Sequence, residues 1–254
     1  MGELHYIAFD EEADDIKEKV ESYWTKRADG FFDLRHDEIE SNKADRWLKE
    51  IEKYLPTGRS LKILDVGCGA GFFEIILGKL GHSVTGIDLT EEMVAKANEM
   101  IRIYDMDSSR VKAIVGDAEN LDFGDEEFDV VISRNLTWTL PHPIDAYVQW
   151  HRVLKKGGVL LNFDAEYAKG AHNLKSPENL AHKDIADSLK EECHDIYHML
   201  TISMLDRPHW DEHVLEDVGF SLVEVDKDFG SRIFLEHDEF YIPDKMFSIK
   251  AIKA

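Results

Sequence analysis

The 254-residue sequence contains only two cysteines, and none of its apolar runs approaches the length of a membrane span. Cys68 lies inside a glycine-rich turn, so a disulfide framework is not expected, and this cysteine usage is typical of a reducing cytoplasm. The N-terminus, Met-Gly-Glu-Leu-His-Tyr followed by acidic residues, lacks the basic and apolar regions of a secretory signal. These absences predict a cytoplasmic protein with no membrane span.

Basic residues are also scarce, because 30 Lys and Arg face 52 Asp and Glu, which leaves a formal net charge of −22. A surface of this sign repels a phosphate backbone, since proteins bind nucleic acids through clustered Lys and Arg. DNA and RNA are therefore not expected as partners. Hydrophobic residues form 43% of the chain, which is enough for the core of one α/β domain with additional segments.

A glycine-rich stretch organises the chain. The apolar run that begins at Leu61 ends in Asp65, and glycines at 67, 69 and 71 precede a helical pattern. This arrangement predicts a buried strand, a tight turn and a helix N-terminus where the backbone can approach a ligand closely. A dinucleotide-binding turn requires G-x-G-x-x-G, but Phe72 stands at the last of those glycine positions. The pattern present is D-x-G-x-G-x-G.

Apolar strands alternate with helical patterns along the rest of the chain, which predicts an α/β fold with a parallel sheet covered on both faces. Further strands are predicted at 83–87, 111–115, 128–132, 159–163, 220–225 and 245–252, and helices at 11–28, 44–54, 72–80, 144–154 and 210–217. Polar residues follow the ends of several strands, where such sheets bind ligands. These residues are Asp65, Asp88, Asp117, Ser133, Arg134, Asn135 and Asp164.

The glycine turn, the acid that ends the second strand and the Gly116-Asp117-Ala118 segment after the third resemble the class I S-adenosylmethionine (SAM) dependent methyltransferases of the type 11, ubiquinone/menaquinone-type group. The resemblance covers about residues 20–165. It implies a Rossmann-like, seven-stranded, mostly parallel sheet with an antiparallel C-terminal hairpin strand. The expected domains are an N-terminal helical cap (1–58), a SAM-binding core (59–164), a helical lid (165–209) and a C-terminal helix and hairpin (210–254). The implied activity is transfer of the SAM methyl group to N, O, S or C of a small molecule, which leaves S-adenosylhomocysteine.

The ribose, the adenine and the methionine end of SAM each require different contacts in the site. Asp88 is placed to accept hydrogen bonds from the two ribose hydroxyls. The resemblance assigns the adenine to Asp117 and Ala118, and the methionine end to Arg134. Tyr23 and Arg27 belong to a Y-W-x-x-R-A-x-x-F segment that folds over the cofactor in related enzymes, although an ordinary amphipathic helix is the alternative. The expected cofactor residues are Asp65, Gly67, Cys68, Gly69, Gly71, Asp88, Leu89, Met93, Asp117, Ala118, Arg134, Tyr23 and Arg27.

Methyl transfer needs in-line positioning, and a general base only if the acceptor must lose a proton. Candidates for such a base are Asn135, His142 and Asp164, each of which has a competing structural role. Trp138, Tyr167, Tyr197 and Trp210 are possible walls of the acceptor pocket.

Other classes of function are less favoured by the motifs. The segment after the fourth strand lacks the Asn/Asp-Pro-Pro-aromatic motif of amino-methylating DNA and RNA enzymes. His194 and His198 have metal-ligand spacing, but no third ligand is evident, so no metal is expected. The main alternative is a non-catalytic SAM-binding regulator, and a nucleotide-dependent oxidoreductase is less favoured. We expect a monomer or homodimer that acts on a small-molecule acceptor.

Overall fold

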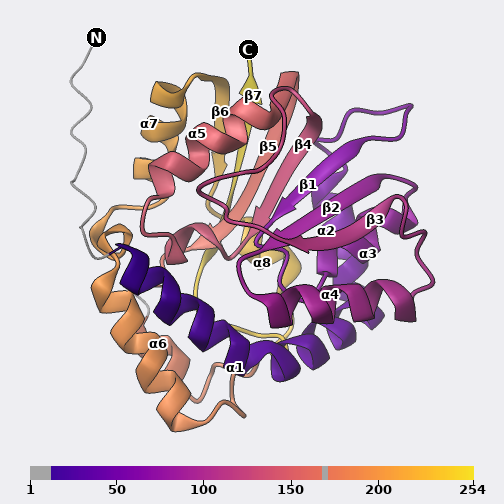
Figure 1. The fold of residues 1–254 in the computed structure, drawn as a ribbon. Coiled ribbons are helices and arrows are strands. Elements are labelled where there is room, and N and C mark those ends of the chain that lie inside the picture. The colour runs from indigo at the N-terminus through magenta and orange to yellow at the C-terminus, as the bar shows by residue number, and fades with distance from the viewer. Residues whose placement is uncertain (1–12, 168–170) are drawn as a thin grey trace.

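A computed structural model describes residues 13–167 and 171–254, so the N-terminal residues considered above as a targeting signal lie outside the described part. Its centre is a seven-stranded sheet with the order β3-β2-β1-β4-β5-β7-β6 (Figure 1). The first five strands are parallel, and β7 is antiparallel to both of its neighbours. This confirms the predicted fold class. The strands are β1 Lys62–Val66, β2 Ser83–Asp88, β3 Val111–Val115, β4 Phe128–Arg134, β5 Leu154–Ala165, β6 Phe220–Asp226 and β7 Met246–Lys253.

Helices cover both faces of the sheet, because successive side chains of the central strands point to opposite sides. In β1, Ile63 packs in a core cluster with α2, α3 and α8, whereas Leu64 packs in a second cluster with α5 and α7. The helices are α1 Ala13–Glu40, α2 Asn42–Ile51, α3 Phe72–Lys79, α4 Glu91–Ile103, α5 Pro143–Val153, α6 Asp187–Met199, α7 His209–Val218 and α8 Phe229–Ile233. None of the helices in the described ranges combines the length and apolar character required to cross a bilayer.

A third core cluster lies outside these two layers and joins α1 to α6. It contains Tyr23 of α1, Trp138 from the short helix Thr137–Thr139, and Cys193 and Tyr197 of α6. In Figure 1, α1 runs obliquely beneath the sheet, with α6 along its N-terminal half. These two helices therefore lie where the carboxyl ends of the parallel strands open.

Two boundaries differ from the sequence expectation. The first helix was expected to end near residue 28, but α1 continues through Gly30 to Glu40. Its second half buries Arg35, Glu38 and Ile39, and this tertiary packing outweighs the helix-weakening effect of one glycine. The fifth strand was expected at 159–163, but β5 spans Leu154–Ala165, and its pairing with β4 is irregular between Phe128 and Val130.

Candidate functional site

The glycine turn after β1 forms the floor of the site. All three glycines have positive φ, which other residues rarely adopt. A Cβ on Gly67 would lie 2.8 Å from Leu136 Cδ1, and one on Gly69 would lie 2.9 Å from Phe31 Cε1. The backbone N–H groups of Gly67 and Cys68 both donate to the Ile87 carbonyl, at 2.8 and 2.9 Å, which holds the turn against β2. The turn is therefore held against β2, and Leu136 and Phe31 pack directly over two of its glycines.

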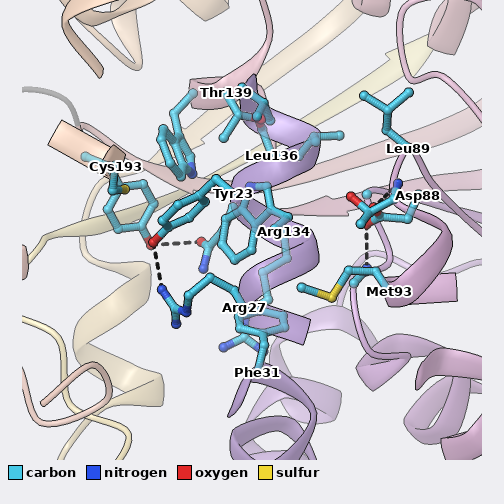
Figure 2. A pocket seen from close by; sticks show the side chains of 18 of the residues that line it. Tyr23, Arg27, Phe31, Asp88, Leu89, Met93, Arg134, Leu136, Thr139 and Cys193 are labelled. Atoms are coloured by element: carbon cyan, nitrogen blue, oxygen red, sulfur yellow. Dashed lines mark hydrogen bonds between the residues drawn. The ribbon is translucent and has the colours of Figure 1, made fainter. Parts of the chain in front are cut away.

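Asp88 joins the glycine turn to the loop after β2. Its carboxylate accepts one hydrogen bond from the Gly69 N–H and another from the Thr90 N–H, both at 3.0 Å (Figure 2). Burial raises the pKa of Asp88, and these backbone donors oppose the effect. Because each carboxylate oxygen has two lone pairs, both can still accept from a ligand.

Behind the turn, Asp65 and Glu74 form a buried acidic pair, and neither oxygen of the Glu74 carboxylate has a hydrogen-bond partner within the described part of the chain. Burial raises the pKa of Asp65 to about 8 and raises that of Glu74 well above its ordinary value, and repulsion between the two groups adds to the effect on Glu74. Glu74 was missed in the sequence analysis, although a single charged residue in the apolar run 72–77 was a visible signal.

A pocket extends from this floor between α1, α6 and the strand ends. At its cofactor end it is lined by Leu89, Met93 and Ala118 together with Asp117. Lys17 of α1 pairs with Asp117 at 2.8 Å and with Glu119 at 2.5 Å, so this end is closed by an ion-pair network. The predicted cofactor residues that line the pocket are Gly67, Gly69, Asp88, Leu89, Met93, Asp117, Ala118, Arg134, Tyr23 and Arg27, whereas Asp65, Cys68 and Gly71 do not reach its lining.

The other end of the pocket is aromatic. The Trp138 ring lies 4.7 Å from the Tyr197 ring and 5.5 Å from the Tyr167 ring, measured between centroids. The Tyr167 hydroxyl donates to Asn135 Oδ1 at 2.9 Å, and Asn135 itself has a φ of 57°. The buried Trp138 Nε1–H has no hydrogen-bond partner within the described part of the chain. This end thus presents apolar rings with a few hydrogen-bonding atoms.

Arg134 lines the pocket and also contacts other side chains of the same protein. Its guanidinium donates to Glu38 at 2.9 and 3.1 Å and stacks on the Trp47 ring. Glu38 also pairs with Arg35 and accepts from Trp47 Nε1. Burial opposes ionisation of Glu38, but Arg134 and Arg35 hold its pKa below the ordinary value. The sequence analysis did not single out Arg35 or Glu38, because neither belongs to a local motif.

Three predicted acceptor residues do not line this pocket. Asp164 accepts from the Trp138 N–H at 3.0 Å and from Arg207 Nη1 at 2.9 Å. The His142 N–H donates to Glu119 at 2.6 Å, and Trp210 packs against Tyr147 in the core. The lining of the acceptor end also includes residues that the sequence analysis missed: Arg35, Asn179, His182, Cys193, Phe240 and Asp244.

The histidine pair on α6 is close enough to bind one ion, since the His194 and His198 Nε2 atoms are 3.0 Å apart. A search of residues 13–167 and 171–254 finds no group of three or more potential metal ligands. The pair carries no further assignment.

Two features define the Rossmann-like methyltransferase class of fold. The antiparallel strand β7 lies between β5 and β6 in the sheet, and the acid at the end of β2 binds the glycine turn. Residues 64–162 match the family model described as "Methyltransferase domain", which confirms the resemblance expected from the motifs.

Relatives agree with this assignment. A demethylmenaquinone methyltransferase of Staphylococcus aureus is 35% identical over 118 residues, which are 45% of this chain and 47% of that protein. The chain thus spans about half the length of curated relatives that it matches. Phosphoethanolamine N-methyltransferase 2 of Haemonchus contortus, solved with SAM, superposes with a TM-score of 0.61 at 20% identity over 82% of this chain and 52% of that one. The [4+2]-cyclase SpnF superposes with a TM-score of 0.54 at 20% identity over 82% and 80%. At these identities, the two structural matches establish the fold alone.

Proposed function

We propose that the protein is a SAM-dependent methyltransferase that acts on a small-molecule acceptor. The observation that carries the proposal is the contact between Asp88 and the Gly69 N–H at the floor of a pocket with an aromatic far end. When bound, SAM supplies an electrophilic methyl group on a positively charged sulfur.

The residues present fit the parts of this cofactor. Asp88 has lone pairs left for two ribose hydroxyls, and Leu89 and Met93 offer apolar walls to an adenine. The Asp117 carboxylate lies beside this wall and can accept from an exocyclic amine. Gly67 and Gly69 line the pocket, where the amino-acid tail can approach their backbone without meeting a side chain on these two residues. These residues bind and orient the cofactor, and α1 with α6 keeps water from the reacting groups.

Binding of S-adenosylhomocysteine, measured by isothermal titration calorimetry, tests the cofactor site. Asp88→Ala removes a charged acceptor of two hydrogen bonds, so we expect its affinity to fall by about 100-fold. Gly69→Val should abolish binding, because the new side chain meets Phe31. Asp122→Asn changes an exposed carboxylate and serves as the matched control. Wild-type affinity in both site variants would contradict the assignment.

Two further measurements separate the alternative functions. Thermal shifts with NAD or NADP in place of SAM would favour an oxidoreductase. Transfer of radiolabelled methyl from SAM to a metabolite extract would favour an enzyme, whereas tight binding without transfer to any fraction would favour a SAM-binding regulator. Mass analysis of the labelled product would identify the acceptor.

A further inference from the structure

The acceptor end of the pocket contains a buried arginine with no acidic partner. Arg27 of α1 is 7% exposed and lines the pocket. Its Nη1 donates to the Tyr23 hydroxyl at 2.7 Å, and its Nη2 lies 3.5 Å from His182 Nδ1 (Figure 2 shows the contact with Tyr23). Over the ranges 13–167 and 171–254, no carboxylate forms an ion pair with Arg27. A buried guanidinium of this kind is costly unless an anion neutralises it.

The neighbouring charged side chains do not supply an acidic partner for Arg27. Arg35 also lines the pocket, and it shares the single carboxylate of Glu38 with Arg134. Glu38 is thus already shared by two guanidinium groups, and it forms no ion pair with Arg27 within the described part of the chain. Asp244 lines the same pocket, but its hydrogen-bond partner is Asn173, and burial raises its pKa to about 6 with no contribution from an arginine. Asp244 is thus not the missing counter-ion.

His182 lines the same space and lies next to Arg27. Burial, with Arg27 and Arg35 nearby, lowers the pKa of His182 to about 3, so its imidazole is neutral at physiological pH. Its Nδ1 lies 3.5 Å from Arg27 Nη2, and the ring also interacts with the backbone of Ala181. His182 therefore places an uncharged polar ring, and no counter-ion, next to the guanidinium.

We propose that the methyl acceptor carries a carboxylate, which is bound by Arg27. The inference rests on the proposed methyltransferase function and names its substrate class. A planar guanidinium matches a carboxylate through two parallel hydrogen bonds. The cofactor's own amino-acid tail is the other possible source of this group. Figure 2 places Arg27 beside Tyr23 and Cys193, on the opposite side of the pocket from Asp88, Leu89 and Met93, which favours the acceptor.

The test begins with the acceptor. A small-metabolite extract is passed over a strong anion exchanger, and each fraction is incubated with the wild-type protein and methyl-labelled SAM. We expect label transfer to the retained fraction, and loss of transfer after carbodiimide coupling of its carboxylates to methylamine. Transfer only to unretained compounds would overturn the inference. So would a retained acceptor that survives amidation but is destroyed by phosphatase.

A second experiment tests whether Arg27 binds the carboxylate of the acceptor. We expect Arg27→Gln to lower transfer to the retained fraction by about 30-fold while the affinity for S-adenosylhomocysteine stays within about twofold of wild type. If the variant instead weakens S-adenosylhomocysteine but not 5′-methylthioadenosine, which lacks the amino-acid tail, then Arg27 serves the cofactor and the inference is wrong.

Two further variants distinguish loss of the carboxylate contact from loss of folding. Lys26→Gln is the matched control on α1, because Lys26 pairs with Glu192 on the surface and should leave transfer unchanged. Arg27→Lys keeps the charge but not the two-pronged geometry, and a raised KM with kcat little changed is expected. Wild-type kinetics in Arg27→Lys and Arg27→Gln would overturn the inference. If the wild-type protein binds S-adenosylhomocysteine but labels no fraction, the proposed function itself fails.

Discussion

At the scale of single residues, the two buried carboxyl groups behind the glycine turn, Asp65 and Glu74, make the stability of the protein sensitive to pH. Their pKa values are raised in the folded protein above those of the unfolded chain. The folded state therefore binds more protons than the unfolded state between about pH 4 and pH 8, and this pair loses its favourable contribution as pH rises through that window. The slope is at most about 1.4 kcal/mol per pH unit for one proton.

We expect Glu74→Gln to flatten this dependence. The amide keeps the shape of the side chain, but it cannot lose a proton. Chemical denaturation at a series of pH values from about 5 to about 8 should give a smaller fall in unfolding free energy than in the wild type. Glu216→Gln, which alters an exposed glutamate on α7, should reproduce the wild-type slope. An equal or steeper slope in Glu74→Gln would show that the raised pKa of Glu74 does not cause the dependence.

At the scale of elements, one buried carboxylate links the second half of α1 to β4. Glu38 is fully buried and accepts from Arg134 of β4, while Arg35 pairs with it from the preceding turn. Removing its charge would leave two guanidinium groups without a partner in a buried setting. The same helix supplies Tyr23 and Arg27 to the pocket, so its position affects both stability and ligand binding.

Glu38→Gln should therefore destabilise the protein by about 3 kcal/mol or more and weaken S-adenosylhomocysteine binding. In a chain of this length that loss lowers Tm by roughly 10 °C. Asp33→Asn changes an exposed acid on the same helix and should stay within about 0.5 kcal/mol of wild type. A thermal melt and a binding titration on the three proteins check both effects. Equal melting temperatures would mean that Glu38 does not hold α1 in place.

Local patterns explain which elements could be predicted from the sequence. The strands and the contact of Asp88 with the glycine turn were predictable, because apolar runs and the motif spacing lie within short segments. Arg35, Glu38 and His182 were not, since their partners lie elsewhere in the chain or depend on tertiary packing. The length of α1 was underestimated for the same reason. Asp164 looked like a site residue at a strand end, but Arg207, 43 residues further on, engages it in the core.

At the scale of the whole molecule, the acidic excess is spread over a surface with many local ion pairs. Repulsion among exposed charges of one sign destabilises the folded state, and salt screens it with a Debye length of about 10 Å at 0.1 M. Each surface ion pair contributes little to the free energy of unfolding. The stability that salt removes by weakening these pairs is therefore smaller than the stability that it adds by reducing repulsion.

We expect the protein to become more stable as salt is added. Its Tm should rise by about 3 °C or more between about 0.02 and 0.5 M NaCl. KCl at equal ionic strength should have the same effect, because screening depends on ionic strength and not on the identity of the cation. A fall in Tm over this range would indicate that attractive ion pairs dominate.

The insertion of β7 between β5 and β6 has a consequence for synthesis on the ribosome. β6 makes no ladder with any strand other than β7 among the residues described, so Phe220–Asp226 stays unpaired until Met246–Lys253 has emerged. A nascent chain that is stalled within the intervening segment would expose the open edge of β5 as well as β6. Ribosome-bound intermediates of this length are thus the stage at which chaperone capture and aggregation compete most directly with completion of the sheet.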